Sequence, residues 1–139
     1  MTKEEKELLL KDLCARLPYE VKVLFENKVF NIDYISAIYK EIKLDDSSKN
    51  YTLNISVVKP YLFPLSSMTK EQLFEVQEIL GKNEIEIENG FLSIIDSGRN
   101  TITYLEILAL LNWFYKNHFD YRGLIEKGLA INATGLNIY

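Results

Sequence analysis

The chain has 139 residues, of which 47% are hydrophobic and 26% are charged. This composition is typical of a globular protein and argues against disorder, and the length predicts a single domain over residues 1–139. The net charge of −4 argues against a nucleic-acid partner, and the single cysteine excludes an intrachain disulfide and a cysteine-based zinc site.

The start of the chain argues against export and membrane insertion. The stretch MTKEEKELLLKDL is charged from its third residue and lacks the long uncharged run of a signal peptide. No apolar run approaches the roughly 20 residues that a membrane span needs. We therefore expect a cytoplasmic protein that has no membrane partner.

A helix is expected close to the start of the chain. Thr2 and Glu5 have the spacing of a capping box, in which each side chain accepts a hydrogen bond from the other residue's backbone N–H. Apolar residues then recur at helical spacing up to Pro18. Cys14 belongs to this apolar stripe, so we expect a buried small side chain and not a reactive thiol.

The next part of the chain predicts an antiparallel meander of three strands. Apolar and polar residues alternate over 21–25, over 29–44 and over 51–58, and alternation at period two is typical of half-buried strands. The middle strand is expected to bulge or break near Ser36. A helix over 33–44 remains open, because several isoleucines there also fit a period near 3.6.

Residues 59–67, KPYLFPLSS, are expected to be extended but unable to pair fully in a sheet, since Pro60 and Pro64 lack backbone N–H groups. Two hypotheses follow. If exposed, Tyr61, Leu62 and Phe63 form an apolar patch for a protein partner. Otherwise the segment is a loop that covers the core.

A second helix follows Thr69, which has capping-box spacing with Gln72. Met68 lies where a hydrophobic staple to Leu73 is expected, and Gly81 is typical of a left-handed residue that ends a helix.

Residues 84–95, EIEIENGFLSII, predict a hairpin, because Asn-Gly is the favoured pair for a type I′ turn. Glu84, Glu86 and Glu88 fall on one side of its first strand. They are either a solvated face or part of an acidic surface that meets a basic partner, since residues 71–106 contain eight acidic and two basic side chains. Whether this hairpin joins the main sheet is open.

A third helix is expected after Thr103, which again has a capping partner in Glu106. The stretch YLEILALLNWFY is apolar around most of its circumference, so we expect the central buried helix of the domain. Asn117 fits a left-handed residue at its end.

The segment that follows contains the only histidine of the chain, and two hypotheses apply to it. In the first, His118 is a joint between helices, and Asp120 caps a short helix over 121–127. In the second, His118, Asp120, Tyr121 and Arg122 converge in a pocket. We favour the first, and the sequence indicates no catalytic residue, metal site or cofactor, because it lacks a nucleophile elbow and a phosphate-binding loop.

Three stretches carry a resemblance to a known family: LLLKDLCARLPYEVKV, VKPYLFPLSSMTKEQ and FYKNHFDYRGLIEKGLA. Together they resemble a family of small proteins of unknown function from gut anaerobic bacteria and their phages and prophages. The resemblance covers less than half of the chain and excludes residues 82–100. It implies a cytoplasmic accessory protein of a mobile element, and it implies no activity or cofactor.

The expected fold is therefore α+β, with the three-stranded meander and the hairpin packed against three main helices and a short C-terminal helix. The expected function is that of a non-enzymatic interaction protein that binds a protein partner or itself. The alternative is a small enzyme or ligand-binding module centred on His118, Asp120 and Arg122.

Overall fold

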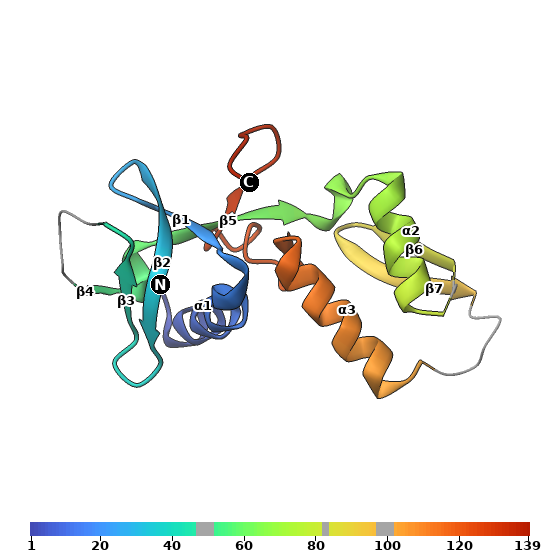
Figure 1. Ribbon diagram of the computed structural model, residues 1–139, viewed down its shortest axis with the longest axis horizontal. Helices are drawn as coiled ribbons and strands as arrows, with labels where there is room; N and C mark the ends of the chain where they lie inside the picture. The colour runs from blue at the N-terminus through green and yellow to red at the C-terminus, as the bar shows by residue number, and fades with distance from the viewer. Residues whose placement is uncertain (47–51, 82–83, 97–101) are drawn as a thin grey trace. The chain divides into compact units, whose positions relative to one another are not determined.

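A computed structural model describes residues 1–46, 52–81, 84–96 and 102–139. It has helices and a mostly antiparallel sheet, which confirms the predicted α+β class (Figure 1). The chain divides into two compact units. Unit 1 comprises Met1–Leu62 and Leu124–Tyr139, and unit 2 comprises Phe63–Gly123. In the described part of the chain, no helix is long and apolar enough to cross a membrane.

Unit 1 begins with helix α1, Lys3–Arg16, which the predicted capping box starts. The Thr2 backbone N–H donates to Glu5 Oε2 over 2.7 Å, and the Glu5 N–H donates to Thr2 Oγ1 over 3.1 Å. The short 3₁₀ helix η1, Leu17–Tyr19, contains Pro18 and follows directly.

The prediction that Cys14 is buried is wrong. Cys14 is exposed, because the buried face of α1 runs through Leu9, Leu13 and two charged residues, Asp12 and Arg16. These positions recur at three and four residues, so they share one side of the helix, and Cys14 lies outside it. A count of apolar residues alone misplaces this face.

Four strands form the meander of unit 1: β1 Lys22–Phe25, β2 Lys28–Ser36, β3 Glu41–Leu44 and β4 Thr52–Asn54. Their order in the sheet is β4-β3-β2-β1. The predicted three-stranded meander is therefore corrected. The long middle strand turns back after Ser36, and Lys40 closes that turn with a φ of 55°. The helix that the spacing also allowed over 33–44 does not form.

Residues 59–64 form strand β5, Lys59–Pro64, and not the predicted loop. In unit 1, β5 pairs antiparallel with β1 and parallel with β9, Ile131–Asn132. The prolines are tolerated because residues between them carry the long-range hydrogen bonds. The Leu62 carbonyl accepts from the Ala133 N–H over 2.8 Å, and the Tyr61 carbonyl accepts from the Tyr139 hydroxyl over 2.8 Å.

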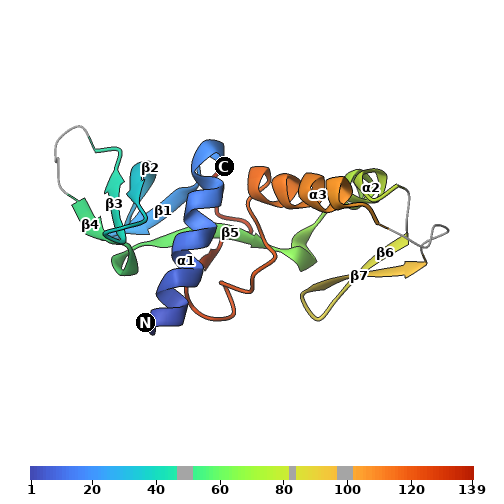
Figure 2. The ribbon, with the colours of Figure 1, turned by 90° about the horizontal axis from the view of Figure 1, so that it is seen from below.

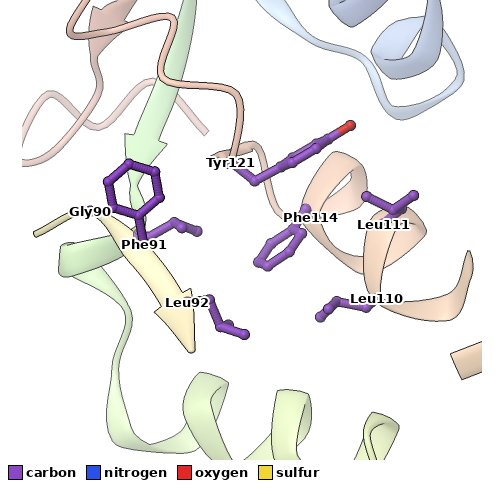
Figure 3. A pocket seen from close by; sticks show the side chains of 8 residues that line it. Gly90, Phe91, Leu92, Leu110, Leu111, Phe114 and Tyr121 are labelled. Carbon is purple, nitrogen blue, oxygen red and sulfur yellow. The ribbon is translucent and has the colours of Figure 1, made fainter. Parts of the chain in front are cut away.

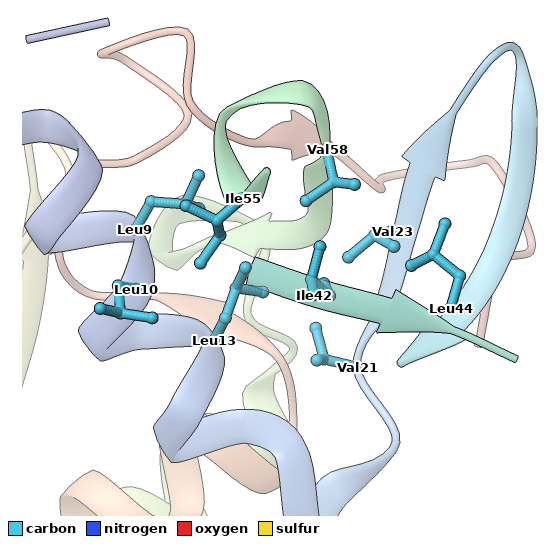
Figure 4. Packing of buried hydrophobic residues seen from close by; sticks show 9 residues of the cluster. All are labelled: Leu9, Leu10, Leu13, Val21, Val23, Ile42, Leu44, Ile55 and Val58. Carbon is cyan, nitrogen blue, oxygen red and sulfur yellow. The ribbon is translucent and has the colours of Figure 1, made fainter. Parts of the chain in front are cut away.

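The main core of unit 1 lies between α1 and the meander (Figures 1 and 2). Leu9 and Leu13 from α1 pack against Val23 from β1 and Ile42 from β3, and all four side chains are fully buried (Figure 4). A second cluster joins Leu62 of β5 to three residues of the C-terminal segment: Leu124, Leu129 and Ala130.

An ion pair is buried within this unit. Arg16 Nε lies 2.7 Å from Asp12 Oδ2, Arg16 Nη2 lies 3.1 Å from Asp12 Oδ1, and both side chains are completely inaccessible to solvent. Removing two charges from water is costly, and the two-pronged contact offsets that cost only while both partners are present.

We predict that Arg16→Met lowers the free energy of unfolding by about 3–5 kcal/mol, because it leaves the Asp12 carboxylate buried without its guanidinium. The double change Asp12→Leu with Arg16→Met should recover most of this loss. Urea unfolding of the three proteins measures the difference. A single variant within about 1 kcal/mol of the wild type would contradict the role of the pair.

Tyr139 forms hydrogen bonds with two strands of the sheet of unit 1, β1 and β5. Its hydroxyl accepts from the Lys22 N–H over 3.1 Å and donates to the Tyr61 carbonyl over 2.8 Å. Burial of the hydroxyl raises the pKa of Tyr139 from 10.0 to about 12. The folded state therefore holds this proton more tightly than the unfolded state does.

Tyr139→Phe should be less stable than the wild type by about 1 kcal/mol at neutral pH, because two hydrogen bonds are lost. A raised folded-state pKa contributes stability that is complete below the unfolded value and disappears as pH rises through the folded value. The advantage of the wild type should therefore shrink between pH 10 and about 12. Paired urea titrations at several pH values test this, and a constant difference across that range would count against the assignment.

Unit 2 contains the second and third helices and the hairpin. After a 3₁₀ turn at Leu65–Ser67, its elements are α2 Lys70–Ile79, β6 Glu84–Glu88, β7 Phe91–Asp96, α3 Tyr104–Lys116 and β8 Phe119–Asp120. Both predicted capping boxes are confirmed, from Thr69 to Gln72 and from Thr103 to Glu106. Gly81 has the expected positive φ of 68°.

The hairpin of β6 and β7 forms a sheet of its own, which answers the question of whether it joins the main sheet. Asn89 and Gly90 have φ values of 51° and 78°, as a type I′ turn requires. Within unit 2, α2 and α3 lie on one side and the hairpin lies on the other (Figure 2). The short strand β8 pairs in parallel with the end of β5, Phe63 opposite Phe119 and Pro64 opposite Asp120.

Two predictions for the last third of the chain are wrong. Helix α3 is not a central buried helix, since Phe114 is its only buried residue. The short C-terminal helix over 121–127 does not form, because these residues make turns, and the chain then enters β9. Gly128, just after this segment, has a positive φ of 69°, and its N–H donates to the Ile125 carbonyl over 3.0 Å.

Candidate functional site

Unit 2 contains an apolar groove with a volume of about 290 Å³ between the hairpin and α3 (Figure 3). In Figure 3, Leu92 of β7 lies on one side of the opening, and Leu110 and Phe114 of α3 lie on the other. The lining residues are Leu65, Gly90, Phe91, Leu92, Leu110, Leu111, Phe114 and Tyr121. We call this set the unit 2 groove.

Helix α3 supplies one wall of the unit 2 groove. Leu110 and Leu111 lie on the same side of the helix as Phe114, because they precede it by four and three residues. Ile107 continues this side by one turn, and 45% of its surface is exposed. Tyr104 follows next to it, 73% exposed. From Tyr104 to Phe114 the wall extends about 15 Å along the helix axis.

The hairpin supplies the opposite wall. Leu92 and Ile87 are cross-strand partners whose side chains pack against the apolar cluster of unit 2. Phe91 is the cross-strand partner of Glu88, and 71% of its surface is exposed. The tight turn at Gly90 places Phe91 and Leu92 at the rim of the groove. The Phe91 ring is exposed to solvent, and the Leu92 side chain packs against the apolar cluster.

Tyr121 contributes an aromatic face to the groove, and its position is set by three neighbours. Its ring stacks on Phe114 at 5.5 Å between centroids, and its hydroxyl lies 2.6 Å from the Tyr115 hydroxyl. Arg122 Nη2 donates to the Tyr115 hydroxyl over 3.1 Å, and its guanidinium carbon lies 4.9 Å from the centre of the Tyr121 ring. These contacts fix the position of the Tyr121 ring.

An aromatic stack supports this end of unit 2. Trp113 of α3 stacks on Phe119 of β8 at 5.4 Å with nearly parallel rings, and Phe63 lies 6.0 Å from Phe119. The indole Nε1–H of Trp113 donates to Glu75 Oε2 of α2 over 2.8 Å. One tryptophan therefore joins the second helix, the third helix and the short parallel strand pair.

His118 ends α3 through its backbone. It adopts a left-handed φ of 58°, its N–H donates to the Tyr115 carbonyl over 3.2 Å, and its carbonyl accepts from the Phe63 N–H over 2.9 Å. Asn117, predicted for the left-handed position, has a φ of −95° instead. Its side-chain amide donates to the Trp113 carbonyl over 2.9 Å, which satisfies a helix-end acceptor in another way.

Only one of the four residues of the predicted alternative pocket lines the unit 2 groove. Tyr121 lines the unit 2 groove, whereas His118, Asp120 and Arg122 are not among its lining residues. Asp120 is buried in β8 and has no helix to cap, which corrects the predicted N-cap. Arg122 donates a hydrogen bond to the Tyr115 hydroxyl, and its guanidinium lies against the Tyr121 ring.

The predicted interaction residues also have different environments. Glu84, Glu86 and Glu88 are exposed on one face of β6, as the alternation indicated. Tyr61 and Leu62 are buried in unit 1, with 7% and 0% of their surface exposed, so they form no exposed patch. Phe63 is half-buried in the apolar cluster of unit 2.

The sequence interpretation missed the groove residues of α3 and of the hairpin turn. The signal was present, because α3 is apolar on more sides than its own unit can cover. The apolar residues of α3 were expected to be buried, yet Leu105, Ile107 and Leu108 are 75%, 45% and 38% exposed. An apolar surface left open in this way marks an interaction site more often than an isolated exposed side chain does.

The groove is lined almost entirely by apolar side chains. The described lining residues include no charged side chain, and their one side-chain polar group is the Tyr121 hydroxyl, already bonded to Tyr115. Nowhere among the described residues do three histidine, cysteine, aspartate or glutamate side chains gather as a metal site would require. A groove lined in this way can bind and desolvate an apolar group.

Comparisons with protein-family models, with curated proteins and with solved structures find no match to this chain.

We predict that Phe119→Ala lowers the free energy of unfolding of the chain by about 3–5 kcal/mol, because it opens a cavity beneath Trp113 in a well-packed cluster. The emission of Trp113 should shift to longer wavelength as water reaches its ring. Denaturant unfolding and fluorescence measure both effects.

Phe74→Ala is the matched control, since Phe74 is 60% exposed on α2. Its effect should stay within about 0.5 kcal/mol, as for an ordinary surface change. Equal losses in the two variants would contradict the central place of the Trp113–Phe119 stack.

Proposed function

We propose that this chain is a non-enzymatic interaction protein and that the unit 2 groove holds an apolar segment of a protein partner. The observation that carries the proposal is the continuity between the groove and the exposed apolar side of α3. Leu111 and Phe114 line the groove, and Ile107 and Tyr104 extend the same side of the helix into solvent. Burying this surface against a partner is favourable, because apolar area leaves water.

The size and chemistry of the groove favour a protein segment over a small metabolite. Its volume of about 290 Å³ lies at the lower edge of the roughly 300–1,000 Å³ of small-ligand sites. Such sites also present a few convergent polar groups that fix the ligand's orientation, and the lining here supplies one hydroxyl that is already bonded. Apolar side chains from a partner meet these requirements without polar recognition.

The alternative function, an enzyme or ligand-binding module centred on His118, Asp120 and Arg122, lacks comparable support. His118 uses its backbone to end α3, and Arg122 holds the Tyr115–Tyr121 pair. The cytoplasmic location and the accessory role in a phage or another mobile element rest on the sequence alone and are part of the proposal.

Ile107→Gln tests the proposal, because Ile107 lies on the groove side of α3. The probe is a neutral amphipathic peptide of about 18 residues with leucines at helical spacing and glutamines elsewhere, long enough to form a helix when bound. We expect the wild type to bind it and Ile107→Gln to weaken binding about fivefold to tenfold, as the loss of one partly buried aliphatic contact implies. Calorimetry gives the affinities, and amide chemical shifts map the contact.

The control is Leu105→Gln. Leu105 is 75% exposed but lies about half a turn around the helix from the groove side, so its replacement should leave the affinity unchanged. A scrambled peptide of the same composition should bind more weakly. The proposal fails if the peptide does not bind, or if both variants bind as the wild type does.

A further inference from the structure

We propose that unit 1 contains a binding site for a phenol, between the Lys22 N–H of β1 and the Tyr61 carbonyl of β5. Tyr139 fills this site from within the chain. Residues 134–139, which we call the strap, open and let the phenol of another molecule take the place of Tyr139. The inference concerns unit 1 and does not depend on the unit 2 groove.

The site follows from the register of the two strands. The pairing of β1 with β5 ends at Val23 opposite Pro60. One step further along this register, Lys22 lies opposite Tyr61, where an antiparallel ladder would join N–H and carbonyl directly. The Tyr139 hydroxyl lies between these two groups instead. It accepts from the Lys22 N–H over 3.1 Å and donates to the Tyr61 carbonyl over 2.8 Å.

The two backbone groups select a hydroxyl. A phenolic O–H accepts one hydrogen bond and donates another, whereas a carboxylate cannot donate and an ammonium cannot accept. A second contact selects an aromatic carrier, because the Lys22 ammonium lies 6.0 Å from the centre of the Tyr139 ring. Hydroxyl and ring are therefore recognised by separate groups of the same residue, Lys22.

The strap is held to the sheet at its end. Between β9 and Tyr139 the chain forms a loop with an exposed tip (Figure 1). Gly135 and Asn137 reverse its direction with positive φ values of 75° and 49°. The Leu136 N–H donates to the Ala133 carbonyl over 3.1 Å, a contact only three positions away. Segments with exposed side chains and local hydrogen bonds open without global unfolding.

Opening of the strap creates the opportunity for an external ligand. When Tyr139 leaves, a buried donor and a buried acceptor lose their shared partner, which is unfavourable. A phenol from another molecule restores both hydrogen bonds. This ligand competes with Tyr139, so its apparent affinity is reduced by the fraction of molecules in which the strap is open.

Tyr139→Ala tests the site, because it empties the site in the full chain. The probe is p-cresol, followed by amide chemical shifts. We expect Tyr139→Ala to bind p-cresol about tenfold more tightly than the wild type does, with a shift of the Lys22 amide. Toluene and 4-methylanisole should bind about tenfold more weakly than p-cresol, because neither donates to the Tyr61 carbonyl.

The matched control is Tyr39→Ala, which removes a tyrosine of unit 1 that is 72% exposed. It should bind p-cresol as weakly as the wild type does. The site is overturned if toluene binds Tyr139→Ala as tightly as p-cresol does, or if p-cresol leaves the Lys22 amide unshifted.

A peptide with the sequence TGLNIY, that of residues 134–139, distinguishes the sources of the phenol. If it binds Tyr139→Ala more tightly than p-cresol does, the ligand is a tyrosine of a protein segment. Equal affinities assign the site to a small free phenol. Both outcomes support the site. The same peptide with phenylalanine in place of tyrosine should bind about tenfold more weakly, and equal binding of the two peptides would contradict the site.

Hydrogen exchange tests the strap without Tyr139→Ala, so the test stands even if that variant is too unstable to fold. In the wild type the Leu136 amide should exchange at least about tenfold faster than the Val23 amide of β1, at a rate that low urea does not change. Tyr139→Phe should raise the Leu136 rate about fivefold. If Leu136 and Val23 exchange with the same urea dependence, the strap does not open by itself, and the competition with Tyr139 is overturned.

Discussion

The hydrogen bonds of the three residues between Pro60 and Pro64 are the constraint on which the arrangement of the C-terminal third depends. The Tyr61 carbonyl accepts from Tyr139, the Leu62 carbonyl accepts from Ala133, and the Phe63 N–H donates to the His118 carbonyl. Each bond joins this tripeptide to a residue more than 50 positions later in the chain. Because buried backbone groups must be paired, the segments after α3 adopt turns and short parallel strands that supply these partners, and not the helix that local signals favour.

The same constraint explains the roles of the conspicuous residues near His118. A left-handed His118 ends α3 and turns its carbonyl toward Phe63, and Phe119 then stacks under Trp113. Tyr121 follows, packed against Phe114 and held through Tyr115 and Arg122. Of the residues that resemble a catalytic set in the sequence, Tyr121 lines the apolar groove, and Arg122 contacts the Tyr121 ring.

Unit 2 leaves more apolar surface open than its own elements cover. α3 packs on the rest of its unit mainly through Leu110, Trp113 and Phe114, while Leu105, Ile107 and Leu108 remain exposed. A two-stranded hairpin and one further helix are too small to surround an apolar helix of this length. The proposed function is based on this uncovered side of α3.

The sequence by itself determined the features that depend on neighbouring residues. These are the three capping boxes, the Asn89–Gly90 turn, the left-handed Gly81 and the exposed acidic face of β6, because each needs only contacts a few positions apart. Tertiary structure alone decided which apolar residues are covered. It buried Asp12 with Arg16 in place of Cys14, and it paired β5 within a sheet despite its prolines. It also left one side of α3 open as a groove wall. Burial depends on which distant segments supply partners, and residue spacing does not encode that choice.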